Sequence, residues 1–326
     1  MGTVVVLCTG GTIASRSVPG GGSRASLSAS ALLERVPVVD GVRVVGRDVR
    51  RVNGFAMTPE DMLDVLAESR RALGEADVDG VVVTHGTDTV EETALLLDLF
   101  HGDERPVVLT GAQRPADALD PDGPANLRDA ITVAAGPQAR GAGVLVVFDG
   151  AVFAARGVRK VHTVASAAFG DPDAGPIGRL TAGRLDLFRN PARSAPLDTA
   201  ALSVPLPRVE VVAVYPGSDA TALEALAAAG ARGLVLQGTG AGNATPAVAA
   251  AVARLVGGGT PVVISTRVPA GPVVPLYSGD GGGVDLVASG AVPAGRLRPG
   301  QARMLLLALL ATGAGPDGIR RSFARC

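Results

Sequence analysis

Residues 81–93 constrain the fold more than any other part of the chain. They begin with the apolar run of Val81, Val82 and Val83, which is typical of a strand buried on both faces of a sheet. The run changes to polar residues at His85, and leucines then recur at helical spacing. A buried strand, a polar turn and a helix in succession predict a parallel βα unit. Its turn should lie at the carboxyl edge of the sheet, where open α/β sheets bind ligands.

The polar turn has two interpretations. Asp88 lies three residues before Glu91, which is the spacing of a capping box. Thr89 has the same relation to Glu92, so both pairs predict an ordinary, well-capped helix start. The position of Thr87 and Asp88 at a strand end favours a ligand-binding or catalytic turn instead.

Composition excludes several classes of protein. The chain has 326 residues, of which 47% are hydrophobic and 19% charged, so it can bury a large core. A net charge of −1 does not indicate a nucleic-acid or membrane-surface partner. No apolar run has the roughly 18 residues of a transmembrane helix, and no signal peptide precedes the first strand, so we expect a cytoplasmic protein. Neither the cysteines, Cys8 and Cys326, nor the three histidines indicate a metal site.

Lys160 is the single lysine among 30 basic residues. The chain uses arginine wherever a generic cation suffices, so a lysine indicates a site where a guanidinium cannot substitute. Lysine can lose its proton when it is desolvated, whereas arginine effectively cannot. The alternative is that one lysine codon survived by chance.

Further strands and helices are expected around the central βα unit. Polar clusters follow three of the strands, at residues 9–12, 84–88 and 110–114, and we expect them to converge on one edge of a single sheet. The glycine-rich segment 16–30 follows Thr12 and is expected to be a flexible loop, either a lid or an idle surface loop. In this part of the chain we expect strands at 3–8, 42–49, 106–110 and 143–148, helices at 29–36 and 58–73, and a hairpin at 151–163.

Two domains are expected. The Pro- and Ser-rich segment 191–207 is the predicted linker between a catalytic domain at 1–190 and a second domain at 208–326. The second part alternates strands and helices, which indicates a layered, mostly parallel α/β domain. Residues 238–243 imitate a dinucleotide fingerprint, but Asn243 occupies the position of the third glycine, so a nucleotide cofactor is disfavoured.

Thr12, Thr87, Asp88 and Lys160 make a candidate set of nucleophiles and bases without histidine. A threonine hydroxyl is weakly acidic and needs help to lose its proton. A lysine held near Asp88 can relay a proton for Thr87. Backbone amides around Gly11 and Thr87 can stabilise an oxyanion. These residues indicate acyl transfer to water, which is amide hydrolysis.

On these residues the chain closely resembles the bacterial-type L-asparaginase family. The segment 9–14, Thr-Gly-Gly-Thr-Ile-Ala, is similar to the first family signature, and residues 84–93 are similar to the second. The resemblance implies a larger flavodoxin-like N-terminal domain and a smaller Rossmann-like C-terminal domain. It also implies that Thr12 attacks the side-chain amide of L-asparagine, giving an acyl-enzyme that water hydrolyses to L-aspartate, with release of ammonia and no cofactor. Other matching segments are 111–115, 122–127, 240–243 and 265–269.

The resemblance further implies roles for individual residues and a homotetramer built as a dimer of dimers. Asp88 would bind the substrate ammonium group, and the Ala112 carbonyl would accept from the leaving amide. Asn243 would reach the site of a neighbouring subunit. The implied catalytic residues are Thr12, Thr87, Asp88 and Lys160. The implied substrate-binding residues are Gly11, Gly54, Phe55, Gly86, Thr87, Asp88, Ala112 and Asn243.

Three departures from the family pattern concern affinity. The lid segment 16–30 lacks the family's tyrosine, the segment 277–283 lacks the partner-subunit glutamate, and Gly54 stands where a carboxylate-binding serine is expected. They predict loose binding, and the bulk of Phe55 predicts a preference for asparagine over glutamine. The alternatives are a mixed glutaminase-asparaginase, a non-catalytic binder of small amino acids, and an amidotransferase subunit acting on misacylated tRNA. The last would need an extra N-terminal domain.

Overall fold

The structure is a computed structural model that describes residues 2–326. The chain divides into two compact units, Met1–Pro196 and Leu197–Cys326. The division falls inside the segment 191–207, where we predicted a linker. Within the described residues, no helix has both the length and the apolar character that crossing a membrane requires.

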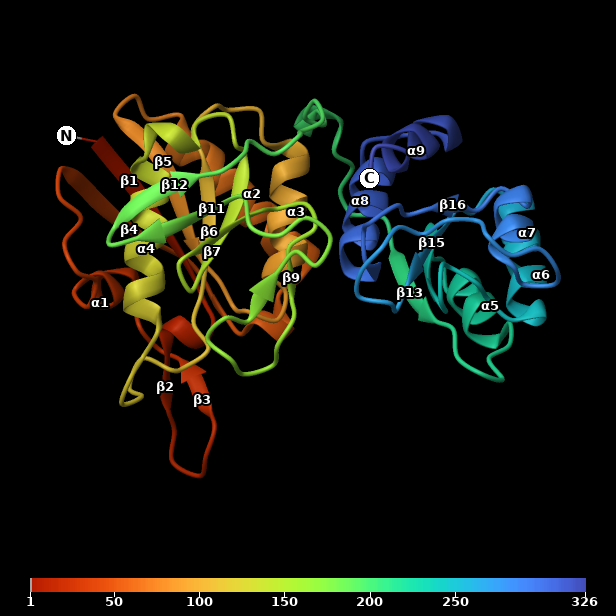
Figure 1. Ribbon diagram of the computed structural model, residues 1–326, viewed down its shortest axis with the longest axis horizontal. Helices are drawn as coiled ribbons and strands as arrows, with labels where there is room; N and C mark the ends of the chain where they lie inside the picture. The colour runs from red at the N-terminus through yellow and green to blue at the C-terminus, as the bar shows by residue number, and fades with distance from the viewer. Residues whose placement is uncertain (1) are drawn as a thin grey trace. The chain divides into compact units, whose positions relative to one another are not determined.

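An eight-stranded sheet forms the middle of the N-terminal unit (Figure 1). Its strands follow the order β12-β11-β8-β7-β6-β5-β1-β4. The five strands from β7 to β4 are parallel, and in chain order their arrangement is 2-1-3-4-5, the flavodoxin-like order. Antiparallel pairing adds β8, β11 and β12 at one edge. The strand bounds are β1 Gly2–Gly10, β4 Val42–Val52, β5 Val78–Thr84, β6 Val107–Thr110, β7 Val144–Phe148, β8 Ala151–Ala154, β11 Gly178–Thr181 and β12 Arg184–Leu187.

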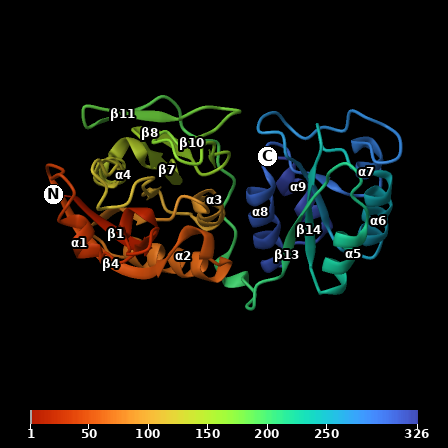
Figure 2. The same ribbon diagram turned by 90° about the horizontal axis from the view of Figure 1, so that it is seen from below.

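Helices cover both faces of this sheet, which explains why its central strands are apolar on both sides. Helices α1 (Ala29–Leu33) and α4 (Gly123–Ala135) share one hydrophobic core with alternate residues of the parallel strands. Helices α2 (Pro59–Leu73) and α3 (Val90–Phe100) pack on each other and on the strands (Figure 2). The 3-10 helices of this unit are η1 Thr12–Ala14, η2 Gly54–Ala56 and η3 Pro137–Ala139.

The predicted hairpin at 151–163 is wrong. Strand β8 pairs with β7 and β11, whereas β9 (Arg159–Lys160) pairs with β10 (Phe169–Gly170). The chain reverses one strand earlier, at Asp149 and Gly150, which have φ of 50° and 70°. An Asp-Gly pair with positive φ at both residues is a two-residue hairpin turn that fits the twist of the strands. That dipeptide was the signal in the sequence.

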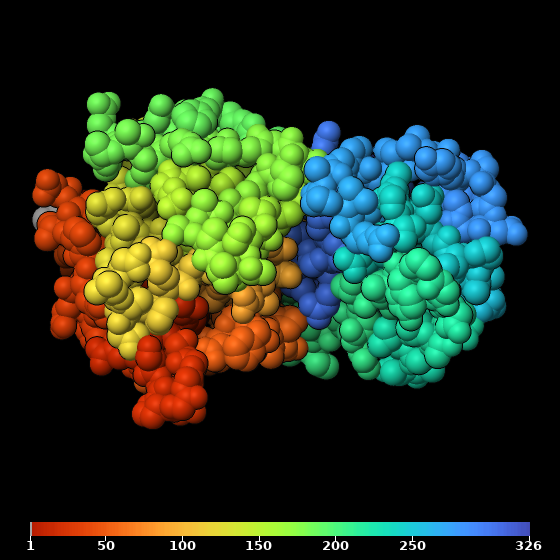
Figure 3. Space-filling view, turned by 60° about the horizontal axis from the view of Figure 1, so that its bottom comes forward, coloured from red at the N-terminus to blue at the C-terminus, as the bar shows by residue number. Residues whose placement is uncertain are grey.

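The glycine-rich segment after Thr12 is a hairpin. Its strands are β2 (Ser15–Ser17) and β3 (Ser23–Ala25), and the glycines between them all have positive φ. The hairpin projects from the N-terminal unit, as its red atoms show in Figure 3. Its residues 16–24 are exposed, and it begins directly after the 3-10 helix that carries Thr12.

The C-terminal unit is a parallel sheet of four strands in the order β13-β14-β15-β16, with helices between them (Figure 1). Helix α7 and strand β16 were not predicted, because both are short and α7 follows a run of glycines without helical periodicity. The bounds are η4 Thr199–Ala201, β13 Val209–Ala213, α5 Thr221–Ala228, β14 Gly233–Gly238, α6 Pro246–Gly257, β15 Val262–Thr266, α7 Gly283–Ala288, β16 Val292–Pro293, α8 Pro299–Ala311 and α9 Pro316–Phe323.

Candidate active site

The three polar clusters meet at one edge of the eight-stranded sheet. Strands β1, β5 and β6 are neighbours and parallel, and Cys8, Thr84 and Thr110 lie in register across them. The predicted convergence is therefore confirmed. In a sheet of order 2-1-3-4-5 the topological switch point lies between the first and third strands, which here are β1 and β5. Thr12 and Thr87 follow the carboxyl ends of these two strands.

Three glycines allow the backbones behind these threonines to touch. A Cβ atom on Gly11 would lie 2.6 Å from Gly86 Cα, and Gly11 has φ of +74°. A Cβ atom on Gly86 would lie 2.4 Å from Gly54 Cα. Because Thr12 directly follows Gly11 and Thr87 directly follows Gly86, this packing brings the two threonines into one site. Any larger residue would push the segments apart.

The lysine reaches one of the two threonines directly. Lys160 Nζ donates to Thr87 Oγ1 at 2.8 Å and to Asp88 Oδ1 at 2.9 Å. Thr87 is buried, at 5% exposure, while the side chains of Lys160 and Asp88 are 19% and 51% exposed. Thr12 is partly buried, and its hydroxyl makes no hydrogen bond within residues 2–326. The arrangement joins an amine, a hydroxyl and a carboxylate after the end of β5, and Thr12 carries a further hydroxyl after the end of the neighbouring strand β1.

The capping-box interpretation, which we held as the alternative for this turn, is wrong. Thr89 is the N-cap of α3, but its side chain makes no capping bond and instead donates to the Gly54 carbonyl at 2.7 Å. Glu91 Oε2 accepts from the backbone N–H of Lys160 at 2.6 Å. Asp88 bonds the lysine amine. These side chains hold other segments against the turn, because partners from distant parts of the chain lie within reach of it. Sequence reasoning assigned no function to Glu91.

A second pair of side chains holds the turn that contains Ala112. Asp122 Oδ2 accepts from the Gln113 N–H at 2.9 Å, and Asn126 Nδ2 donates to the Gly111 carbonyl at 3.0 Å. Both groups come from the start of α4, and Ala112 itself is buried. The matching segment 122–127 therefore fixes the backbone from which the Ala112 carbonyl would accept a hydrogen bond.

His85 does not supply a base to this site. It is buried, its Nδ1–H donates to the Gly86 carbonyl at 2.8 Å, and its Nε2 accepts from the Thr93 hydroxyl at 2.9 Å. Burial lowers the pKa of His85 to about 4. The ring is therefore neutral at physiological pH, and both of its nitrogens are occupied in holding the turn.

Of the backbone amides around Gly11 and Thr87 that we expect to stabilise an oxyanion, the amide of Gly11 already has a hydrogen-bond partner within the chain. The Gly11 N–H donates to the Val52 carbonyl at 2.9 Å. A donor that is already bonded to a carbonyl cannot turn to a developing charge without breaking that bond. The amides of the neighbouring Thr12 and Thr87 are the remaining candidates in this region.

Gly54, Phe55 and Asn243, which are also expected to bind substrate, differ in burial and in hydrogen bonding. Gly54 is buried under Gly86, whereas Phe55 is 75% exposed. Asn243 belongs to the C-terminal unit, in the turn after β14, and its Oδ1 accepts from the Gly283 N–H at 3.1 Å. Asn243 is therefore held in place within its own unit.

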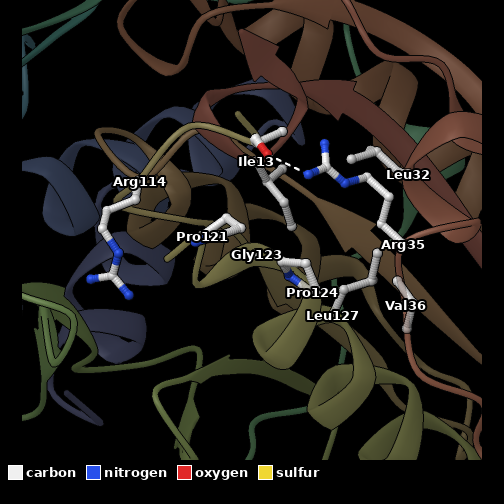
Figure 4. Close-up of a pocket in the computed structure, with 10 residues that line it drawn as sticks. Ile13, Leu32, Arg35, Val36, Arg114, Pro121, Gly123, Pro124 and Leu127 are labelled. Atoms are coloured by element: carbon white, nitrogen blue, oxygen red, sulfur yellow. Dashed lines mark hydrogen bonds between the residues drawn. The ribbon is translucent and has the colours of Figure 1, made fainter. Parts of the chain in front are cut away.

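A small cavity lies next to η1, on the side of α1 and α4 (Figure 4). It is mostly apolar, and both of its arginines already have hydrogen-bond partners within the chain. Arg35 donates to the Ala116 carbonyl, and Arg114 donates to Ser166 Oγ at 2.7 Å. We infer that the cavity is a packing space. Its lining residues are Ile13, Leu32, Arg35, Val36, Arg114, Ala116, Pro121, Gly123, Pro124 and Leu127.

The cluster can perform one kind of chemistry with its own groups. A hydroxyl beside an amine and a carboxylate can act as a nucleophile and exchange protons. No group of three or more histidine, cysteine or acidic residues in the described chain is arranged to hold a metal ion. A two-unit α/β fold with this cluster at the switch point defines a class of hydrolase that transfers an acyl group through a hydroxyl.

Comparison with known proteins identifies the family. The family model "Asparaginase, N-terminal" matches residues 3–193, and the model "Glutaminase/Asparaginase C-terminal domain" matches residues 208–323. The chain therefore belongs to the asparaginase family.

Relatives and solved structures resemble the chain over nearly its whole length. "Probable L-asparaginase" of Deinococcus radiodurans is 41% identical, over 99% of this chain and 97% of that protein. "Probable L-asparaginase periplasmic" of Haemophilus influenzae is 36% identical, over 98% and 92%. The crystal structure of "Probable Cytoplasmic L-asparaginase from Campylobacter jejuni" has a TM-score of 0.90 and 32% identity, and the match covers 99% of each chain.

Proposed function

We propose that this protein is an L-asparaginase that hydrolyses L-asparagine to L-aspartate and ammonia. The observation that carries the proposal is the contact of Lys160 Nζ with Thr87 Oγ1 and Asp88 Oδ1 at the β1/β5 switch point. Family membership, and relatives whose names specify L-asparaginase, support the substrate.

Thr12 is the proposed nucleophile. Its hydroxyl oxygen attacks the side-chain amide carbon, its proton passes to the leaving nitrogen, and ammonia departs from an aspartyl ester of Thr12. Water then attacks the ester, which releases L-aspartate and restores the hydroxyl. Lys160, bonded to Thr87 and Asp88, exchanges the protons that these steps require. The Ala112 carbonyl accepts a hydrogen bond from the leaving amide.

The direct test is ammonia release by the purified protein with L-asparagine, D-asparagine and L-glutamine. Thr12→Ala should reduce turnover by about 100-fold or more, with little effect on folding because the hydroxyl makes no hydrogen bond within residues 2–326. Thr12→Ser is the matched control, since it keeps a hydroxyl and should retain measurable activity. A Thr12→Ala protein that keeps more than about a tenth of the wild-type rate would rule out this nucleophile.

The main alternative is a mixed glutaminase-asparaginase. The name of the C-terminal family model, which includes glutaminases, is consistent with this alternative. We propose a preference for asparagine, and comparable kcat/KM values on glutamine would favour the alternative. A non-catalytic binder would release no ammonia from either amide. We also propose that the protein is a homotetramer with shared sites, which light scattering tests by measuring the mass of the oligomer. We further propose a cytoplasmic location, which cell fractionation tests.

A further inference from the structure

Both ends of Lys160 are tied to the same short segment. Its amine bonds Thr87 and Asp88, and its backbone N–H bonds Glu91 Oε2 at 2.6 Å. Thr87 and Asp88 directly precede Thr89, the N-cap of α3, and Glu91 lies in the first turn of this helix. The start of one helix therefore provides both the groups that the amine contacts and the group that holds its backbone.

Strand β9, which contains Lys160, is not part of the eight-stranded sheet. It has two residues and, within the described chain, pairs only with β10, where Lys160 is opposite Phe169. The next residue, Val161, donates its N–H to the Ala168 carbonyl at 2.7 Å. The sheet that places Thr87 thus does not itself place Lys160. A hydrogen bond from the backbone of β9 to a side chain of α3 can set the distance between these two elements.

The Glu91 carboxylate, which accepts this hydrogen bond, is buried at a cost in free energy. Burial raises the pKa of the Glu91 carboxyl, and the Lys160 N–H and the charges of Arg159 and Lys160 offset part of the rise. Burying a carboxylate is unfavourable unless its partners compensate. A hydrogen bond to a carboxylate is shorter and stronger than one to a neutral acceptor. A buried carboxylate that accepts a short hydrogen bond lowers the stability of the fold. We therefore expect one where the position of its hydrogen-bond partner matters for function.

We propose that Glu91 is a positioning residue, which fixes Lys160 Nζ relative to Thr87 Oγ1 and Asp88 Oδ1 by accepting the Lys160 backbone N–H. The proposal rests on the proposed function, because it assigns Lys160 to the proton exchanges of that reaction. A displacement of about 1 Å at a catalytic group can cost on the order of 100-fold in rate.

The kinetic test compares Glu91→Ala and Glu91→Gln with Asp98→Asn. Asp98 is the matched control, because it is a carboxylate of α3, 13% exposed, whose Oδ1 accepts the Val144 N–H at 3.1 Å. Glu91→Ala should lower kcat about 10- to 100-fold with a smaller change in KM. Glu91→Gln keeps an acceptor oxygen and should recover most of kcat. Asp98→Asn should leave kcat unchanged.

Two kinetic results would overturn the proposal. One is a wild-type kcat in Glu91→Ala, and the other is a Glu91→Gln protein as slow as Glu91→Ala. If Glu91→Ala does not fold, Glu91→Asp takes its place. Its carboxylate is drawn back by one methylene and should support a lower kcat than the glutamine variant, because it no longer reaches the Lys160 N–H.

A second measurement does not depend on turnover. Because Lys160 is the only lysine, isotope-labelled lysine gives one side-chain amine signal in an NMR spectrum. Glu91→Ala should shift this signal and accelerate exchange of its protons with water, while Glu91→Gln and Asp98→Asn leave it near the wild-type position. An unmoved signal in Glu91→Ala refutes the positioning role. If the wild-type protein released no ammonia, the proposed function would fail, and this signal would still test whether Glu91 holds Lys160.

Discussion

The backbone of Gly11 lies directly against the backbone of Gly86, so that a Cβ atom on Gly11 would be 2.6 Å from both the Gly86 nitrogen and its Cα. This contact is the reason that Thr12 and Thr87, which follow different strands, occupy one site. It depends on the absence of two side chains and on a backbone conformation with positive φ at Gly11.

Gly11→Ala should therefore damage both stability and catalysis. With φ of 74° and ψ of −176°, Gly11 lies in a backbone region that essentially only glycine adopts, so another residue there costs on the order of 1–3 kcal/mol. The collision with Gly86 adds to that cost. Gly41→Ala is the matched control, because Gly41 has the same φ of +74° and a Cβ atom there would have nothing within 4 Å of it. Denaturant unfolding and kcat are the measurements. We expect Gly41→Ala to lose only the stability that the unfavourable backbone conformation costs, and to keep its activity. Equal losses of stability and activity in the two variants would contradict the packing explanation.

Lys160→Arg should fail almost as badly as Lys160→Met. Arginine keeps the positive charge near Asp88 but effectively never releases its proton, so it cannot relay one. A lost general acid–base group typically lowers rates about 100- to 10,000-fold, and kcat with L-asparagine is the measurement. Substantial activity in Lys160→Arg would mean that Lys160 acts only as an electrostatic support.

Gly54→Ser tests the missing partner for the substrate carboxylate. A Cβ atom on Gly54 would lie 3.0 Å from the Gly86 Cα, so any side chain here requires a small shift of Gly86. Gly54→Ala carries the same steric cost without a hydroxyl and is the proper reference. A hydrogen bond to a charged group contributes roughly 1.5–3 kcal/mol, so KM for L-asparagine should be about 10- to 100-fold lower in the serine variant than in the alanine variant. Equal KM values would show that another group holds the carboxylate.

Acid should destabilise the protein partly through His85. Its pKa is about 4 in the folded protein, because of burial, and about 6.5 in the unfolded chain. The unfolded chain therefore binds a proton first as the pH falls, and stability is lost between about pH 6.5 and pH 4. The full loss is on the order of 3 kcal/mol, and a lowered pKa of the buried His101 acts in the same direction. Unfolding free energies of wild type and His85→Gln across this range are the check, and a slope that His85→Gln does not reduce would contradict the assignment.

Shared sites can be detected by mixing two inactive proteins. Thr12→Ala lacks the proposed nucleophile, and Asn243→Ala lacks the residue expected to reach a neighbouring subunit's site. If sites are shared, mixed oligomers should contain some intact sites and regain part of the activity. The measurement is ammonia release after subunit exchange, with exchange verified by mass labelling. No recovery despite complete exchange would place each site within a single chain.

The sequence predicted the convergence of the polar clusters correctly, because regular secondary structure decides their position. Apolar strands followed by helices predict parallel βα units, and parallel strands end on a common edge, so the polar clusters after β1, β5 and β6 had to converge. The predicted hairpin at 151–163 is wrong because the chain reverses at Asp149 and Gly150, whose Asp-Gly sequence is typical of a two-residue turn.

Other features depended on the tertiary structure alone. The spacing of Thr89 and Glu91 is the same whether their side chains cap α3 or bond Gly54 and Lys160, since helix geometry makes both possible. Which partner a side chain takes is decided by the segments that folding brings within about 3 Å of it. The sequence by itself thus determined the parallel strands, their common carboxyl edge and the candidates for the reactive side chains. Only the packing of distant segments decided that glycine backbones join the two threonines and that a glutamate holds the lysine.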